Sequence, residues 1–200
     1  IKKKDNTIIK ALKILRKNKI ISNFYSISII KNIPIYSGMG GGTGNAVTLA
    51  KFLSNNNISK NLLNVFSKQI GSDFKLFFYK QGFLKNLNVV KKFKKEYKLY
   101  FLLVYPNIKS STKFVYSKIK KFSSKAEYNF TTINNKSKFL KFLVDKNNNL
   151  QRIVENQYPV IKKIIKEMNQ KKGCYFSRMT GSGSVCYGVF KSEKLAKSAL

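Results

Sequence analysis

One stretch of the chain reads Pro34-Ile35-Tyr36-Ser37-Gly38-Met39-Gly40-Gly41-Gly42-Thr43-Gly44-Asn45-Ala46. Five of the seven residues from Gly38 to Gly44 are glycine, and the apolar residues that follow repeat at helical spacing. Glycine allows a positive φ and lets backbone N–H groups approach a ligand, while the first turn of a helix adds unpaired donors and a partial positive charge. The stretch therefore predicts a phosphate-binding loop that enters a helix.

Neither of the two best-known phosphate motifs is present. The P-loop requires lysine and then serine or threonine after its last glycine, but Gly44 is followed by Asn45 and Ala46. The dinucleotide fingerprint requires a glycine where this chain has Thr43. A glycine-rich hairpin or linker is the structural alternative, and it is disfavoured because linkers rarely run straight into an amphipathic helix.

Asp73 is the candidate catalytic residue. The chain has only eight acidic residues, and this one lies between a predicted helix end at Gly71 and an apolar segment predicted to be a strand. A partly buried carboxylate must be held by hydrogen bonds or a cation, because otherwise its burial costs several kcal/mol. An ordinary turn or cap aspartate is the alternative interpretation.

A second glycine-containing stretch lies about 140 residues after the first. It reads Arg178-Met179-Thr180-Gly181-Ser182-Gly183-Ser184 and precedes a predicted strand. Its glycines permit a tight turn between strands, and its N–H and hydroxyl groups can face a substrate or phosphates. Taken alone it would be a common hairpin or linker, but the combination with Asp73 and the first loop is specific.

Together these segments resemble the second and third motifs of the GHMP kinases. The triple glycine with Asn45, and the Gly71-Ser72-Asp73 segment, are similar to the branch that acts on 4-diphosphocytidyl-2-C-methyl-D-erythritol. The resemblance implies an α+β fold with two subdomains, the first like ribosomal S5 domain 2 and the second ferredoxin-like. It implies an ATP-binding domain over 1–95, truncated at its start, and a C-terminal domain over 96–200, truncated at its end.

The resemblance also implies the reaction, a phosphoryl transfer from Mg²⁺-ATP to the 2-hydroxyl of that substrate in isoprenoid precursor synthesis. Asp73 would be the base, and Thr43 is a candidate metal ligand. The residues implied to bind ATP are Pro34, Ile35, Tyr36, Ser37, Gly38, Met39, Gly40, Gly41, Gly42, Thr43, Gly44, Asn45, Lys31 and Asn6. Thr180, Gly181, Ser182 and Gly183 would line the substrate side. A plain helix N-cap is the alternative role for Asn6.

The chain departs from the family pattern in two places. The first motif of the family, with its lysine and a later histidine-containing segment, is missing, and the chain has no histidine. We therefore expect the chain as given to be a fragment with little or no activity. Gly44 stands where the family usually has a second serine, so one hydroxyl that could orient phosphate or Mg²⁺ is absent.

The formal net charge of +32 would by itself suggest nucleic acid or an anionic surface as partner. However, Arg16, Arg152 and Arg178 are the only arginines, and the lysines are scattered along the whole chain. Base readout and bidentate phosphate recognition favour arginine, so a solvated lysine-rich surface is the preferred interpretation. Three alternatives stay open: another GHMP kinase of the mevalonate or homoserine type, a non-catalytic basic protein that binds nucleic acid, and a decayed homologue.

The remaining composition predicts a protein of the reducing cytoplasm, and its oligomeric state stays open. No run of 18 apolar residues and no signal-peptide pattern occurs. Two cysteines without histidine give neither a disulfide framework nor a Cys/His zinc site. The charged stretch 91–98 predicts the passage between the two domains.

The apolar periodicity and the capping residues predict the order of the secondary-structure elements. The predicted helices cover 7–17, 46–53, 59–70, 114–122, 150–156 and 159–172, with a last one after Ser192, and the predicted strands cover 25–29, 74–78, 100–104 and the residues after Ser184.

Overall fold

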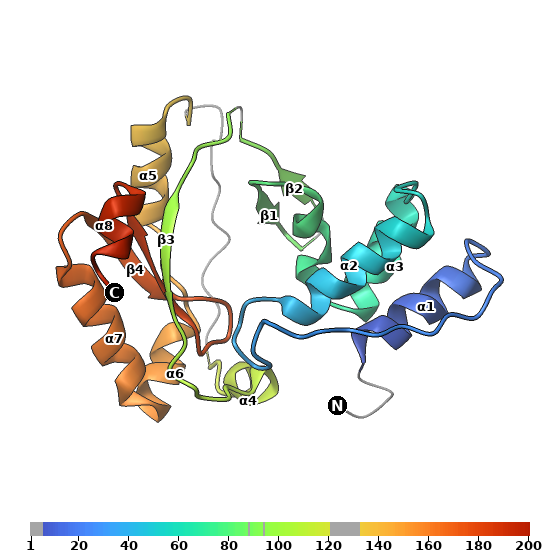
Figure 1. Cartoon of the computed structure of the whole chain (residues 1–200), viewed down its shortest axis with the longest axis horizontal. Helices are drawn as coiled ribbons and strands as arrows, with labels where there is room; N and C mark the ends of the chain where they lie inside the picture. Colours follow the sequence, from blue (N-terminus) through green and yellow to red (C-terminus); the bar gives the residue numbers. More distant parts are fainter. Residues whose placement is uncertain (1–5, 88, 94, 121–132) are drawn as a thin grey trace. The chain divides into compact units, whose positions relative to one another are not determined.

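The computed structural model describes residues 6–87, 89–93, 95–120 and 133–200 (Figure 1). The chain divides into two units, each with its own core. The first contains the described residues of Ile1–Asn32 and Gly40–Phe93, and the second those of Ile33–Met39 and Lys94–Leu200. The glycine-rich stretch is thus shared, because residues 33–39 pack with the second unit and Gly40 begins the return to the first.

The first unit contains three α-helices, a 3₁₀ helix and a short antiparallel hairpin. The elements are α1 (Thr7–Lys17), α2 (Gly41–Leu53), α3 (Lys60–Gln69), the 3₁₀ helix η2 (Ser72–Phe78), β1 (Phe83–Lys85) and β2 (Val89–Lys91). The helices α1 and α3 begin where their capping residues predict. The Asn6 side chain accepts a hydrogen bond from the N–H of Ile8, and the Ser59 side chain accepts one from the N–H of Leu62.

The core of this unit lies where α1, α2, α3 and η2 meet. Its fully buried residues include Leu15 of α1, Ala50 of α2, Phe66 of α3 and Phe74 of η2. The rings of Phe66 and Phe74 are stacked, with centroids 4.6 Å apart and planes within 2° of parallel. This stacked pair fixes η2 on α3 and therefore fixes the residues that η2 carries.

The second unit is built on a three-stranded antiparallel sheet with the order β3-β5-β4. Its strands are β3 (Tyr100–Val104), β4 (Cys174–Met179) and β5 (Cys186–Phe190), and its helices are α4 (Thr112–Ser117), α5 (Lys136–Val144), α6 (Gln151–Gln157), α7 (Pro159–Gln170) and α8 (Glu193–Lys197). Because β3 and β4 are both antiparallel to β5, they are parallel to each other. This is the split β-α-β arrangement of ferredoxin-like folds, as predicted.

Alternation along the strands separates two apolar clusters in this unit. On one face, Leu102, Met179 and Phe190 pack with Ile161 of α7 and with residues of α6 and α8. On the other, Phe176 and Val189 pack against Leu140 of α5. The two cysteines, Cys174 and Cys186, are free thiols, and burial raises the pKa of Cys186 to about 12.

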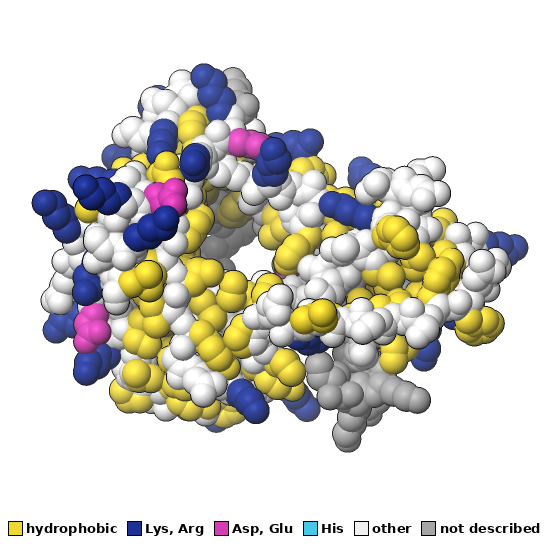
Figure 2. Space-filling model, viewed as in Figure 1, with side chains coloured by type: hydrophobic (Ala, Val, Ile, Leu, Met, Phe, Trp, Pro, Cys, Tyr) yellow, Lys and Arg dark blue, Asp and Glu magenta, His cyan; other side chains and the backbone are white. Residues whose placement is uncertain are grey.

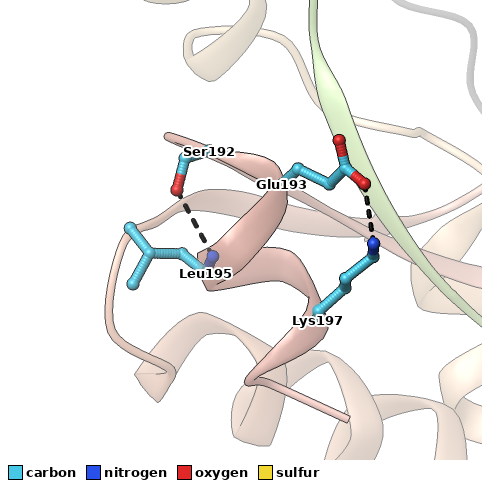
Figure 3. A network of polar contacts seen from close by, with 4 residues as sticks. All are labelled: Ser192, Glu193, Leu195 and Lys197. Carbon is cyan, nitrogen blue, oxygen red and sulfur yellow. Dashed lines mark hydrogen bonds and ion pairs between the residues drawn. The ribbon is translucent and has the colours of Figure 1, made fainter.

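The last helix illustrates how local sequence sets an element boundary (Figure 3). The Ser192 hydroxyl oxygen accepts a hydrogen bond of 3.3 Å from the N–H of Leu195, and the Lys197 ammonium lies 2.8 Å from the Glu193 carboxylate. Both charged side chains are mostly exposed, so the ion pair adds little stability and the cap decides where α8 begins.

Several sequence predictions about elements are wrong. The segment around Tyr25 and Ile29 lies outside the helices and strands and pairs with no described strand, and a period-2 pattern cannot form a ladder without a neighbour. The apolar segment after Asp73 is the 3₁₀ helix η2 and not a strand. The helix α2 begins at Gly41, inside the glycine run rather than after it. The helical periodicity would also bury Val160 on α7, but this side chain is 43% exposed.

Two further boundaries differ in the second unit. The helix predicted over 114–122 starts at Thr112 and ends at Ser117, and its predicted end at Phe122 lies outside the described residues. The helix α5 (Lys136–Val144) was not predicted from the sequence, and its first three residues lie at the end of the stretch 122–138, which was expected to be irregular. Its start is marked by Asn135, whose side chain accepts a hydrogen bond from the N–H of Lys138.

Lysine and arginine side chains are spread over the visible surface, with few acidic ones between them (Figure 2). No helix in the described part of the chain is long and apolar enough to cross a membrane. The described residues also contain no group of three or more cysteine, aspartate or glutamate side chains that could hold a metal ion.

Candidate active site

The first part of the candidate site is the N-terminus of α2. Gly40 is the N-cap, with the left-handed φ of 66°, and no side chain caps this helix end. The first intrahelical hydrogen bond runs from the N–H of Gly44 to the carbonyl of Gly40, at 2.8 Å. The N–H groups of Gly41, Gly42 and Thr43 therefore have no intrahelical acceptor, which leaves three donors at the positive end of the helix dipole.

Gly40 also packs closely against η2. A Cβ atom at this position would lie 2.9 Å from the Phe77 ring and 3.2 Å from Oδ2 of Asp73. Both the positive φ and the missing side chain are thus required here. The consequence is that the Asp73 carboxylate lies next to the uncapped end of α2.

Thr43 joins α2 directly to Asp73. Its Oγ1 donates a hydrogen bond of 3.2 Å to Oδ1 of the carboxylate. Partial burial raises the pKa of Asp73, while this hydrogen bond and one from its own backbone N–H lower it, and burial is the largest cause. A raised pKa makes the carboxylate a stronger base than an exposed aspartate.

Two contacts with α3 hold the η2 turn that carries Asp73. The Phe74 ring stacks on Phe66, as described above, and the buried Lys75 ammonium donates a hydrogen bond of 2.6 Å to Oδ1 of Asn64. The two residues that follow Asp73 in η2 are therefore both held on α3. Such fixation limits the reorientation that a catalytic carboxylate would need during reaction.

Gly71 has a role that the sequence did not reveal. It was predicted to end α3 as a left-handed C′ residue, but its φ of 172° is ordinary extended backbone. The reason for glycine is spatial, because a Cβ atom would lie 2.7 Å from Oδ1 of Asp73 and 3.4 Å from Oγ1 of Thr43. Any side chain at Gly71 would push into the Thr43–Asp73 hydrogen bond.

The N-terminal candidates have simpler surroundings. Asn6 caps α1 through its hydrogen bond with the N–H of Ile8, at 2.9 Å, and its contact with adenine stays a prediction. The next residue, Thr7, donates a hydrogen bond of 2.8 Å to the carbonyl of Gly42 and so ties α1 to the first turn of α2. Lys31 is exposed and lies outside the helices and strands, and its place near the nucleotide stays a prediction.

The second unit holds the other part of the predicted site, the loop from Thr180 to Ser184. Residues of the glycine-rich stretch pack on this loop: the N–H of Val185 donates to the carbonyl of Ser37 at 3.0 Å, and Oγ1 of Thr180 donates to the carbonyl of Gly38 at 3.3 Å. Gly38 has a φ of 75° and lies against the loop backbone. Pro34, Ile35, Tyr36 and Met39, which belong to this unit too, stay predicted nucleotide contacts.

Side chains that were not predicted to be site residues form hydrogen bonds with this loop. Ser110 donates a hydrogen bond of 2.7 Å to the carbonyl of Ser182, and the hydroxyls of Thr112 and Ser182 are 2.8 Å apart. Asn148 donates to the carbonyls of Met179 and Gly181, both at 2.8 Å. The polar pairs Ser110-Ser111 and Asn147-Asn148 were visible in the sequence, but only as helix caps.

Replacing Gly44 with alanine should stabilise the first unit by about 0.5 kcal/mol. Gly44 is helical, so alanine gains up to about 1 kcal/mol of helix propensity. Part of that gain is offset because the new Cβ would lie 3.2 Å from the Phe77 ring. The ring is 39% exposed and can shift outward. Urea unfolding of the variant measures the difference, and a loss of more than about 1 kcal/mol would mean that the ring cannot move.

Comparisons with known proteins show the family to which the chain belongs. A family model described as "GHMP kinases N terminal domain" matches residues 6–76, and one described as "GHMP kinases C terminal" matches residues 135–200. The 4-diphosphocytidyl-2-C-methyl-D-erythritol kinase of Pelagibacter ubique is 37% identical, over 98% of this chain and 70% of the relative. The enzyme of the same name from Wolbachia pipientis wMel is 31% identical, over 97% of this chain and 68% of the relative.

Two solved structures share the fold. A crystal structure of 4-(cytidine 5'-diphospho)-2C-methyl-D-erythritol kinase matches with a TM-score of 0.70 and 17% identity, over 97% of this chain and 72% of that one. Homoserine kinase from Cytophaga hutchinsonii matches with a TM-score of 0.67 and 14% identity, over 98% and 70%. At these identities the solved structures show the fold alone. The relatives found by sequence show which branch of the family the chain belongs to. The chain belongs to the GHMP kinases, phosphotransferases with an alcohol group as acceptor, and within them to the 4-diphosphocytidyl-2-C-methyl-D-erythritol kinases.

Proposed function

We propose that this chain, in its natural polypeptide, transfers the γ-phosphoryl group of ATP to the 2-hydroxyl of 4-diphosphocytidyl-2-C-methyl-D-erythritol, in the cytoplasm, as a step of isoprenoid precursor synthesis. The relatives with this name support the substrate. The observation that carries the chemistry is the hydrogen bond from Thr43 to Asp73, which holds a carboxylate of raised pKa beside the uncapped N-terminus of α2.

In this proposal the N–H groups of Gly41, Gly42 and Thr43 bind phosphate oxygens. These donors have no intrahelical acceptor and lie at the positive end of a helix, where an anion is stabilised. Phosphoryl transfer mostly requires positioning and charge neutralisation, which fixed backbone donors supply. Thr180 to Gly183 would bind on the substrate side, through a loop whose backbone is fixed by Ser110, Thr112 and Asn148.

Asp73 would accept the proton of the attacking hydroxyl at a carboxylate oxygen. Oδ1 already accepts a hydrogen bond from Thr43, so this bond would orient the carboxylate and leave Oδ2 for the proton. The Thr43 hydroxyl and the Asp73 carboxylate are oxygen donors of the kind that Mg²⁺ prefers, and the Thr43 oxygen keeps lone pairs while its hydrogen is donated. Mg²⁺, when bound with ATP, would neutralise charge on the phosphates.

The test is phosphoryl transfer by the natural polypeptide that contains these 200 residues. We expect turnover of 4-diphosphocytidyl-2-C-methyl-D-erythritol, and turnover of mevalonate and homoserine lower by at least about a hundredfold. Turnover of mevalonate or homoserine instead would assign the chain to another GHMP substrate. A folded polypeptide that binds ATP and turns over none of the three would support the decayed homologue.

A further inference from the structure

The second unit contains an open cavity of about 760 Å³ that the proposed reaction does not use. Gln151, Arg152 and Glu155 of α6, Lys162 of α7, Arg178 of β4 and the turn residue Asn148 line it, together with further polar side chains. This volume is within the range of small-molecule sites in proteins. The lining is rich in amide and charged groups, so a polar ligand is indicated.

The charges in the cavity favour an anion. Two of the three arginines of the chain, Arg152 and Arg178, line it with Lys162, against the single carboxylate of Glu155. Glu155 accepts a hydrogen bond of 2.8 Å from Nε2 of Gln151, and neither Arg152 nor Lys162 has a recorded ion pair within the described part of the chain. The cavity wall therefore carries more positive than negative charge.

Arg178 is already held in place. Its Nη2 donates a hydrogen bond of 2.8 Å to the carbonyl of Val144, and its guanidinium lies 4.3 Å from the centre of the Phe176 ring. Burial raises the pKa of the Tyr187 phenol, and the positive charge of Arg178 acts in the opposite direction. A guanidinium fixed in this way presents its remaining donors to a phosphate with little loss of side-chain freedom.

Two residues of the cavity also hold the Thr180 loop. Asn148 donates to the carbonyls of Met179 and Gly181, and Oε1 of Gln151 accepts a hydrogen bond of 3.0 Å from the N–H of Met179. A ligand that contacts the amide groups of Asn148 and Gln151 would alter these hydrogen bonds, which hold the backbone at the start of the Thr180 loop. Occupancy of the cavity is thus linked to the loop through three hydrogen bonds.

We propose that this cavity binds a small phosphorylated metabolite and that binding is transmitted through Asn148 and Gln151 to the loop from Thr180 to Gly183. Arg152, Lys162 and Arg178 would bind the phosphate, and the amide side chains would bind hydroxyl groups of the ligand. The cavity is much larger than inorganic phosphate, which favours an organic phosphate.

The test is a titration of the isotope-labelled 200-residue chain with ribose 5-phosphate and, separately, with inorganic phosphate, followed by backbone amide NMR at about 0.15 M salt, where exposed charges are screened beyond about 8 Å. We expect ribose 5-phosphate to shift the amide signals of Met179 and Gly181 saturably and to bind more tightly than inorganic phosphate. In the double variant Arg152→Gln/Lys162→Gln, binding should weaken by at least about tenfold, which is the loss of roughly one charged hydrogen bond.

Lys163→Gln is the matched control, because Lys163 neighbours Lys162, is 75% exposed and does not line the cavity. Equal weakening in this control would show non-specific attraction by a basic surface and overturn the proposal. Shifts confined to Gly41, Gly42 and Thr43, or unchanged binding in the double variant, would overturn it too. If inorganic phosphate bound as tightly as ribose 5-phosphate, the proposal that the ligand is an organic phosphate would be wrong. The exposed positions of Arg152 and Lys162 make loss of folding in these variants easy to exclude from the same spectra.

Discussion

Replacing Asp73 with asparagine is expected to lower kcat for phosphoryl transfer at least about a hundredfold in the natural polypeptide, which is the usual contribution of a positioned general base. Asparagine keeps the shape of the side chain and can still accept the hydrogen bond from Thr43. It cannot take a proton from a hydroxyl, so the loss should fall on kcat and not on the KM for ATP. Steady-state kinetics at saturating and limiting ATP separate the two.

The same variant should be slightly more stable than the parent at neutral pH. Burial raises the pKa of Asp73, so the unfolded chain releases this proton at a lower pH than the folded chain does. Stability that is present below pH 3.8, the ordinary value of this carboxyl, is therefore lost as the pH rises through the raised pKa of the folded state. Asparagine has no such loss, and we expect a gain of about 1 kcal/mol or less because the carboxylate keeps some contact with water.

Asp145→Asn is the matched control for both measurements. Asp145 is an exposed residue at the C-terminal end of α5, where the same change should leave kcat within about twofold and stability within about 0.5 kcal/mol. An Asp73→Asn enzyme with the kcat of the parent would remove Asp73 as the base. If both variants lost kcat equally, the loss would come from the change in net charge and not from the position of Asp73.

The sequence predicted the elements whose boundaries are decided locally. Asn6, Ser59 and Ser192 each cap a helix through their own side chain, and Pro159 stands at the first position of α7. Capping and proline geometry involve residues a few positions apart, so they can be read without knowledge of tertiary contacts. The split β-α-β sheet followed from the resemblance and from the continuous apolar strand Tyr100–Val104.

The elements that depend on distant partners were predicted less well. The alternation around Tyr25 indicates a strand only if a neighbour is available to pair with it, and the short apolar segment Phe74–Phe78 fits a strand or a helix equally. In the structure the segment Phe74–Phe78 is helical, and the Phe74 ring stacks on Phe66 of α3. A contact between residues eight positions apart on different elements has no local signal.

The candidate site shows the same division. The glycine run and Asp73 were identified from residue type and spacing, but the hydrogen bond between Thr43 and Asp73 joins residues 30 positions apart. The lack of space for a side chain at Gly71 is caused by the same two residues, so it could not be predicted from the sequence either. The sequence therefore predicts which residues would carry chemistry, whereas the contacts that explain their neighbours appear only in the folded chain.

Replacing Gly38 with alanine is expected to cost the second unit about 3 kcal/mol or more. Its φ of 75° is unfavourable for alanine by about 1–2 kcal/mol. In addition, the new Cβ would lie 2.2 Å from the carbonyl oxygen of Thr180 and 2.8 Å from the nitrogen of Gly183. Both atoms are backbone and cannot move aside as a side chain would, so overpacking adds about 1–3 kcal/mol. The strain should release residues 33–39 from the Thr180 loop.

Hydrogen exchange of the Val185 amide measures this release, because that N–H donates to the carbonyl of Ser37. We expect its protection to fall by at least about a hundredfold, the equivalent of roughly 3 kcal/mol. Gly42→Ala is the matched control within the same glycine run, since Gly42 has no positive φ and its Cβ would meet only the Thr7 side chain at 3.5 Å, an ordinary contact. If Val185 were equally protected in both variants, the close packing of Gly38 on the Thr180 loop would not hold in solution. A selective loss in Gly38→Ala would instead mean that this glycine holds residues 33–39 against the Thr180 loop.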